Sequence, residues 1–284
     1  MKVIKARVLG WCMGVRRAVE KAQNSLTENS DEKNKKGVFT LGPLIHNPSV
    51  LSSLEEKGLK VIENPDELKN PSSSSVIIRA HGTTPFVVKN LEELGVQIID
   101  ATCPKVTASQ NRARIWSSKG YKIYIAGDRN HGEVIGIASH SENGAIVIEN
   151  ENEALNLEID EKSVLLAQTT FSPSEFEKIA SVFKKKNPDV KIFNSICSAT
   201  MERQKALDEL EGKVDGIIVI GGRNSANTKR LYEKALKLCS YACLIEKTDE
   251  IPEDFFKLKR VGLTAGASTP DSVINEVESL LLKL

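Results

Sequence analysis

A threefold internal repeat constrains the fold of this 284-residue chain more than any other feature. Three runs rich in β-branched and apolar residues each end in a cysteine, and these cysteines recur about every 90 residues. They are Cys12, Cys103 and Cys197. After each cysteine the apolar residues take helical spacing, and a short apolar run ending in glycine follows: GVFTLG, YKIYIAG and DGIIVIG. Each cysteine is therefore predicted to lie at the N-terminus of a helix.

The order strand, helix, strand in each repeat predicts βαβ units and parallel sheets. The predicted fold class is α/β, with three pseudo-symmetric α/β lobes and mostly parallel sheets. The lobes are expected at residues 13–102, 103–196 and 197–281.

Polar side chains follow two strands of every repeat. After the strand that ends in glycine come His46, His131, and Ser225 with Asn227; after a further strand come His81, Thr169 and Ser268. Parallel α/β sheets bind ligands at the carboxyl ends of their strands. If the three lobes meet about a pseudo-threefold axis, the cysteines and these polar groups share one cavity.

Composition excludes several classes of partner. Lys and Arg number 39 against 38 Asp and Glu, a net charge of +1, which gives no support for binding to nucleic acid or an anionic membrane. The apolar runs are too short to span a bilayer, and the first residues lack the apolar stretch of a signal peptide. A cytoplasmic location is expected, with cysteines that are reduced or bind metal.

The three repeated cysteines are candidate metal ligands, because packing gives no reason for a cysteine at the same helix start three times. Zinc with a histidine as fourth ligand is one reading, although structural zinc sites usually take closely spaced cysteine pairs. A four-iron cluster with three thiolate ligands would leave one iron open, which suits reductive removal of a hydroxyl group. Cys239 and Cys243 fall outside the repeat and are expected to pack.

Three of the four histidines occupy repeat positions, and with Ser225, Asn227 and Ser268 they suggest a phosphate cradle. Glu133 is either a solvated loop carboxylate or the proton donor of the cavity. His140 has no counterpart in the repeat. The segment GGRNSAN lacks the ending of a nucleotide P-loop, so neither ATP nor NAD is expected.

Taken together, these motifs resemble the 4-hydroxy-3-methylbut-2-enyl diphosphate reductase family over nearly the whole chain. The matching segments are GWCMGVRRAV, PLIHNPSV, RAHG, DATCP, HGE, QTT, SICSAT, RNSANTKRL and TAGASTPD. The family often has two serines where this chain has Ser225 and Ala226.

The resemblance implies a trefoil of lobes around one central [4Fe-4S] cluster per chain, with Cys12, Cys103 and Cys197 as metal ligands and one iron without a protein thiolate. The implied diphosphate ligands are His46, His81, His131, Ser225, Asn227 and Ser268. Glu133 would be the proton source, and Thr169 would orient the substrate hydroxyl and that carboxylate. Electrons from a ferredoxin or flavodoxin would convert the substrate to isopentenyl and dimethylallyl diphosphate, the last step of the non-mevalonate isoprenoid pathway.

Two other functions use the same cysteines. An iron–sulfur hydro-lyase would need the open iron but no electrons. A cluster-based redox sensor would bind a partner protein and leave the histidines and serines unexplained.

Overall fold

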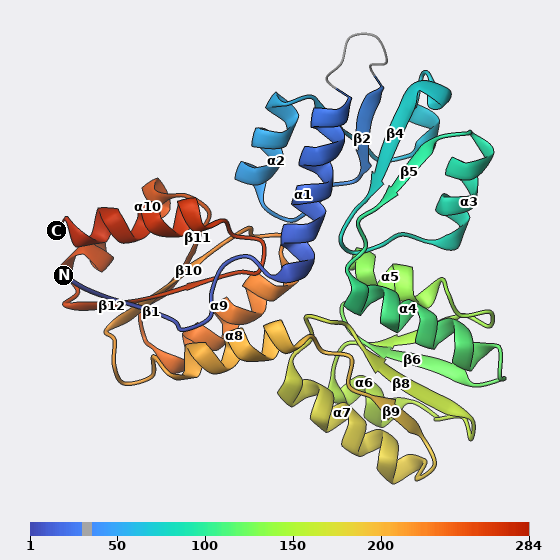
Figure 1. Ribbon diagram of the computed structural model, residues 1–284. Coiled ribbons are helices and arrows are strands. Elements are labelled where there is room, and N and C mark those ends of the chain that lie inside the picture. The colour runs from blue at the N-terminus through green and yellow to red at the C-terminus, as the bar shows by residue number, and fades with distance from the viewer. Residues whose placement is uncertain (30–35, 284) are drawn as a thin grey trace. The chain divides into compact units, whose positions relative to one another are not determined.

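The computed structural model describes residues 1–29 and 36–283. Their strands are β1 (Lys2–Lys5), β2 (Gly37–Leu41), β3 (Leu59–Ile62), β4 (Ser74–Ile78), β5 (Gln97–Asp100), β6 (Lys122–Ala126), β7 (Ala145–Ile148), β8 (Ser163–Ala167), β9 (Lys191–Phe193), β10 (Gly216–Ile220), β11 (Ala242–Ile245) and β12 (Arg260–Ala265). The α-helices are α1 (Met13–Glu28), α2 (Pro48–Glu56), α3 (Pro85–Glu93), α4 (Pro104–Ser117), α5 (Gly132–Ala138), α6 (Glu151–Asn156), α7 (Pro173–Lys186), α8 (Ser198–Asp208), α9 (Ala226–Leu238) and α10 (Asp271–Leu282) (Figure 1). Short 3₁₀ helices are η1 (Pro65–Glu67), η2 (Pro71–Ser73), η3 (Thr248–Glu250) and η4 (Glu253–Lys257).

These strands form three sheets of four strands, and every pairing is parallel. Sheet A has the order β1-β12-β10-β11, sheet B has β3-β2-β4-β5 and sheet C has β7-β6-β8-β9. The predicted α/β class with parallel sheets is confirmed. None of the helices in the described part of the chain is long and apolar enough to cross a membrane.

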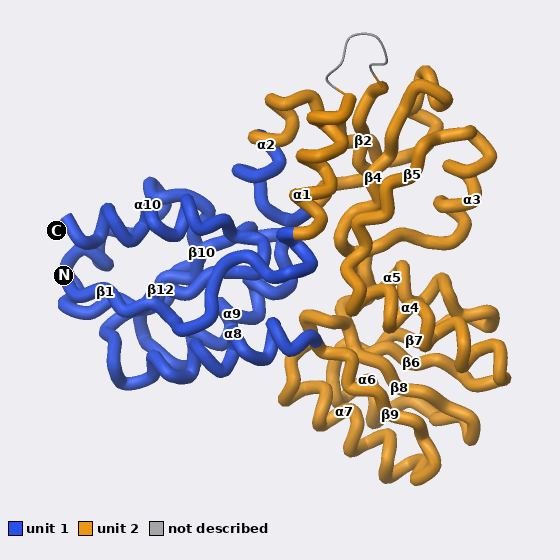
Figure 2. The backbone as a smooth tube through the Cα atoms, in the orientation of Figure 1, with its two compact units in different colours: residues 1–16, 45–52, 197–284 blue, residues 17–44, 53–196 orange. Residues whose placement is uncertain are grey.

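The chain divides into two compact units, shown in Figure 2. One consists of residues 1–16, 45–52 and 197–284 and contains sheet A, so we call it the sheet A unit. The other consists of residues 17–44 and 53–196 and contains sheets B and C, so we call it the sheet B/C unit. The predicted boundaries of three lobes stay a prediction.

One expectation about connectivity was wrong: the strand before each cysteine does not pair with the strand after the following helix. β5 lies beside β4 in sheet B, whereas α4 leads on to β6 in sheet C. The reason is that the helix packs on the next sheet, where Ala113 of α4 contacts the cluster around Ile123 and Ile125. β9 and β1 follow the same rule, so β1 is an edge strand of sheet A beside β12.

Those edge strands also end before their cysteines. The side chain of Asp100 accepts from the Thr102 amide at 2.8 Å, and that of Asn194 accepts from the Ile196 amide at 3.1 Å. In such an arrangement an Asp or Asn side chain satisfies the backbone amide two residues later, just after the strand. Cys103 and Cys197 therefore lie in the short segment between the edge strand and the helix.

The central strands of sheets A and C are apolar on both faces, as expected for a parallel sheet covered by helices on both sides. In sheet A, Ile217 and Val219 pack with the cluster of α8 and α9 residues, while Ile218 and Ile220 pack with the cluster that includes α10. Figure 1 shows these helices on opposite faces of the sheet. Sheet C repeats the plan, with α4 and α5 on one face and α6 and α7 on the other. Rigid sheets of this kind fix the position of whatever follows their strands.

Candidate functional site

All three repeated cysteines lie directly before a helix, as predicted. Cys103 and Cys197 are the N-cap residues of α4 and α8, with extended backbone at φ/ψ of −62/132° and −66/135°. The carbonyl oxygens of Cys12, Cys103 and Cys197 accept the first helical bond from the amide four residues on, at 3.0, 3.0 and 3.1 Å. The Cys12 Sγ also accepts from the Val15 amide at 3.5 Å. Free amides and the helix dipole favour a thiolate at such a position.

The other two cysteines have a different environment. The Cys239 thiol donates to the carbonyl of Asp215 at 3.3 Å, and burial raises the pKa of Cys243 to about 12. A thiol with that pKa stays protonated at neutral pH, and the thiolate is the form that binds metal. This supports the prediction that this pair has a packing role.

In the sheet B/C unit, the ends of β4 and β6 bring two histidines together. The rings of His81 and His131 are edge to face, with centroids 5.1 Å apart and planes at 89°. Nδ1 of His131 accepts from the Glu133 amide at 3.2 Å, as an N-cap side chain does. In a neutral imidazole the proton is then on Nε2.

Glu133 is buried, with 1% of its surface exposed, and its carboxylate meets Thr169 at the end of β8. One oxygen accepts from the Thr169 amide at 2.6 Å and the other from the Thr169 hydroxyl at 2.8 Å. A buried carboxylate needs such donors, because an unsolvated charge is costly. The interpretation of Glu133 as a solvated loop carboxylate is therefore wrong. Its carboxyl group is buried and held in place by two hydrogen bonds from Thr169.

In the sheet A unit, the loop after β10 and the loop after β12 both approach His46. The Ser268 hydroxyl donates to the His46 carbonyl at 3.1 Å. A side chain at Gly222 would collide with that same carbonyl oxygen, so the approach requires glycine. A serine hydroxyl has one proton, so Ser268 can donate to a ligand only by releasing His46.

Ser225 and Asn227 begin α9 in the same unit. Ser225 is the N-cap, and its hydroxyl oxygen accepts from the Thr228 amide at 3.3 Å, which leaves the hydroxyl proton available. Asn227 is only 3% exposed, and its Nδ2 has no hydrogen-bond partner among the residues that the structure describes. A buried amide without an acceptor points to a ligand that supplies one.

Sequence reasoning missed two residues. Gln168 is fully buried; its side-chain oxygen accepts from the Asp128 amide at 2.9 Å and its amide donates to Thr170 at 3.1 Å, so it holds the loop that leads to His131. Arg203 is a buried arginine on α8 close to two of the cysteines. His140, which has no counterpart in the repeat, lies with its Nδ1 2.7 Å from the Gly136 carbonyl at the end of α5.

The fold and these groups define a parallel α/β protein with thiol, histidine and carboxylate groups at helix starts and strand ends. The chain belongs to the LytB protein family, whose model matches residues 3–282. It is 47% identical to the 4-hydroxy-3-methylbut-2-enyl diphosphate reductase of Treponema denticola, with all of both chains covered. It is 43% identical to the protein of that name from Caldanaerobacter subterraneus, over 98% of this chain and 95% of the relative.

Solved structures agree with this relationship. The E-1-hydroxy-2-methyl-but-2-enyl-4-diphosphate reductase from Plasmodium falciparum superposes with a TM-score of 0.91 at 27% identity, covering 98% of this chain and 87% of that one. A second structure, of (E)-4-hydroxy-3-methyl-but-2-enyl diphosphate reductase, the terminal enzyme of the non-mevalonate pathway, gives a TM-score of 0.71 at 37% identity with both chains fully covered.

Proposed function

We propose that this chain is a 4-hydroxy-3-methylbut-2-enyl diphosphate reductase that uses one [4Fe-4S] cluster and yields isopentenyl and dimethylallyl diphosphate. The observation that carries the proposal is the cysteine that caps a helix at the same place in three repeats. The three thiolates would come from Cys12, directly before the proposed lobe 13–102, and from Cys103 and Cys197, which begin the proposed lobes 103–196 and 197–281. The names of the relatives support the same substrate.

The donor set fits such a cluster. Three thiolates far apart in sequence, each beside free helix amides, suit a cluster that keeps one iron without a protein ligand. When bound, that cluster supplies the electrons of the reaction and an open iron for the substrate hydroxyl.

The proposed diphosphate donors lie at helix starts and strand ends. His131 is one proposed donor, Ser225 offers its hydroxyl proton, and Asn227 offers a buried amide that has no acceptor among the described residues. The further donors in the proposal are His46, His81 and Ser268. Donors of this kind match the oxygens of a diphosphate, and a helix N-terminus such as that of α9 favours its negative charge.

Glu133, once its carboxylate has taken up a proton, is the proposed proton donor. The two Thr169 donors fix both oxygens of its carboxyl group, so the acid is positioned before substrate arrives. In the overall reaction the C–O bond breaks, a C–H bond forms, and the substrate takes up two electrons and two protons as water leaves. A ferredoxin or flavodoxin is the proposed source of the electrons, and the proposed location is the cytoplasm.

The test is anaerobic. The protein is reconstituted with iron and sulfide, and oxidation of a reduced one-electron dye is followed with 4-hydroxy-3-methylbut-2-enyl diphosphate as substrate. Dye oxidation that depends on substrate and releases both five-carbon diphosphates is the expected result. A cluster that assembles while the dye stays reduced would overturn the reductase function and favour a hydro-lyase or a sensor.

Two cysteine variants make the test specific for the ligands. Cys103→Ser should lose the four-iron cluster, because it removes a proposed ligand. Cys243→Ser is the matched control and should assemble the cluster normally, since burial keeps that thiol protonated. A complete cluster in Cys103→Ser would show that the ligand assignment is wrong.

A further inference from the structure

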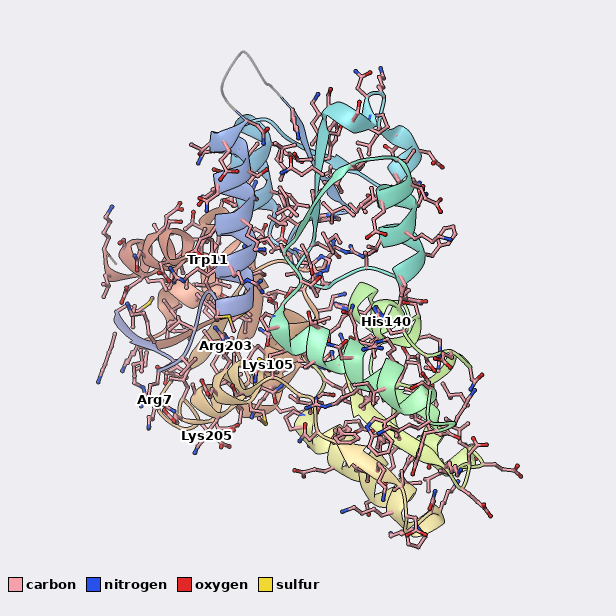
Figure 3. The ribbon with its side chains drawn as sticks, turned by 45° about the vertical axis from the view of Figure 1, so that its right-hand side comes forward. Arg7, Trp11, Lys105, His140, Arg203 and Lys205 are labelled. Carbon is pink, nitrogen blue, oxygen red and sulfur yellow. The ribbon has the colours of Figure 1, made fainter. Side chains whose placement is uncertain are left out.

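Arg203 is a buried cation within the sheet A unit (Figure 3). It lies on α8 with 3% of its surface exposed. Arginine stays protonated in proteins, so α8 carries a positive charge into the interior of this unit. Burying a charge is costly unless it is paired and hydrogen-bonded. The surroundings of Arg203 must therefore account for that cost.

Its hydrogen bonds tie together two segments that are far apart in sequence. Nη2 donates to the carbonyl of Gly10 at 2.5 Å, and Nη1 donates to the carbonyl of Ala199 at 2.7 Å. Gly10 is two residues before Cys12, and Ala199 is two residues after Cys197. One guanidinium thus connects the turn that carries Cys12 to the first turn of the helix that Cys197 caps.

Carbonyl oxygens satisfy donors but do not balance a full charge. None of the ion pairs in the described residues includes Arg203, and its Nε is buried there without a hydrogen-bond partner. Desolvation lowers the pKa of Arg203, while the nearby thiolate charges of Cys12 and Cys197 raise it, as does Glu202. The two segments that Arg203 bonds, at Gly10 and at Ala199, are thus the ones that carry Cys12 and Cys197.

The internal repeat shows that the arginine is not required by the helix itself. Arg203 is six residues after its cysteine, and the residues six after Cys12 and Cys103 are Ala18 and Ser109. Both are buried with no exposed surface. Two of the three helices therefore fill this interior position with a small side chain, and only α8 places a long cation there.

We propose that Arg203 is a positioning residue that ties the Cys12 turn to α8 and supplies the buried positive charge for the thiolates of Cys12 and Cys197 and the cluster they would hold. The cluster part of this inference rests on the proposed function. A fixed positive charge stabilises the state with one more electron, so it raises the reduction potential of the cluster for one-electron uptake from its donor protein. The Nε–H, which has no partner among the described residues, would be available to donate to a sulfide of the bound cluster.

Three variants separate the charge from the hydrogen bonds. Arg203→Met removes both and keeps much of the volume, whereas Arg203→Lys keeps the charge and loses the planar fork. Lys205→Met is the matched control, because it removes an exposed positive charge two residues away on the same helix (Figure 3).

The first measurement uses metal-free protein, so that it does not depend on the cluster. Amide hydrogen exchange of residues 8–16 should become at least about tenfold faster in Arg203→Met than in Lys205→Met, because the bond to the Gly10 carbonyl is lost. Equal exchange in these two variants would overturn the positioning role. Arg203→Lys should lie between them, and it decides the question if Arg203→Met does not fold.

The second measurement uses anaerobically reconstituted protein and redox titration of the reduced cluster by electron paramagnetic resonance. The potential should shift to more negative values in Arg203→Met and remain close to that of the wild type in Arg203→Lys and Lys205→Met. The same potential in Arg203→Met and Lys205→Met would overturn the role of the charge. A wild type that takes up no cluster would contradict the proposed function and the charge role with it, while hydrogen exchange would still decide the positioning role.

Discussion

The helices α5 and α9 begin in the same way, but the side chain two residues after each N-cap differs in charge and in partners. The side chains of His131 and Ser225 cap the helices by accepting hydrogen bonds from backbone amides, at 3.2 and 3.3 Å respectively. Glu133 then receives two hydrogen bonds from Thr169, whereas the Nδ2 of Asn227 has no partner in the described part of the chain. Both side chains are almost completely buried.

The difference shows how one repeat position can serve two chemical purposes. The start of a helix favours negative charge. At α5 the protein supplies that charge itself as a carboxylate and holds it with donors from the neighbouring strand end. At α9 it supplies a neutral amide whose donor is unused, so the negative charge is left for a ligand to bring.

The largest expected effect comes from removing the acid of α5. Glu133→Gln keeps the size and the oxygen acceptor but cannot release a proton, so turnover should fall about 100- to 10,000-fold. Steady-state dye oxidation measures this, and iron content should stay at the wild-type value. Glu177→Gln, an exposed glutamate of α7, is the control for loss of charge.

Unchanged turnover in Glu133→Gln would remove Glu133 from the chemistry. The proposed difference between α5 and α9 would then be wrong, because Glu133 and Asn227 would both serve ligand binding alone.

The second effect concerns the unused amide of α9. Asn227→Ala removes one donor to the diphosphate, which should raise KM about tenfold with little change in kcat. Asn227→Asp has the same shape but places a negative charge there, as α5 does, and should raise KM further. Isothermal titration calorimetry with inorganic pyrophosphate measures the affinity of the wild type and both variants, which should weaken in the order wild type, Asn227→Ala, Asn227→Asp. Equal affinity in all three proteins would show that Asn227 does not contact the ligand.

Much of this site was predictable because its residues follow local rules. An apolar run ending in glycine marks a central strand, and the polar residue after it marks a strand end, which located His131 and Ser225. The partners of these residues were not predictable. The bond from Ser268 to the His46 carbonyl joins residues 222 apart, and no periodic pattern encodes such a pairing.

The same reason explains the wrong connectivity and the missed arginine. β1 pairs with β12, at the other end of the chain, because a parallel partner is chosen by packing between distant segments. Arg203 did carry a signal, since the repeat has alanine and serine at the corresponding positions. The importance of this difference becomes clear only when Arg203 is known to be buried, because an arginine in a sequence is ordinarily expected to be exposed.

A third effect, of similar size, tests how Glu133 is held. Thr169→Val removes the hydroxyl donor and keeps the backbone amide, so one of the two hydrogen bonds to the carboxylate remains. We expect kcat to fall about tenfold, the loss that corresponds to one hydrogen bond to a charged group. Thr169→Ser retains the hydroxyl and should stay close to the wild type. A serine variant as slow as the valine variant would mean that packing of the methyl group matters, not the hydrogen bond.

The smallest expected effect is on stability and comes from a difference between the cores of sheets A and C. It should appear only in alkaline solution. Tyr124 of β6 stands where β10 has Ile218, and its hydroxyl donates to Asp160 at 2.6 Å. Burial, followed by this hydrogen bond, raises the pKa of Tyr124 to about 12 from its ordinary value of 10.0. A raised folded-state pKa means that the stabilisation is complete below the unfolded-state pKa and is lost as pH rises through the folded-state pKa.

The melting temperature of the wild type should therefore fall more steeply between about pH 10 and pH 12 than that of Tyr124→Phe, which has no hydroxyl to ionise. Thermal unfolding followed by circular dichroism measures both curves. Tyr241→Phe, which alters a tyrosine that is 51% exposed, controls for the general effect of alkali. Parallel curves for the wild type and Tyr124→Phe would mean that the hydroxyl ionises as readily in the folded protein as in the unfolded chain. In that case the cores of sheets A and C would respond to alkali alike, despite tyrosine in one and isoleucine in the other.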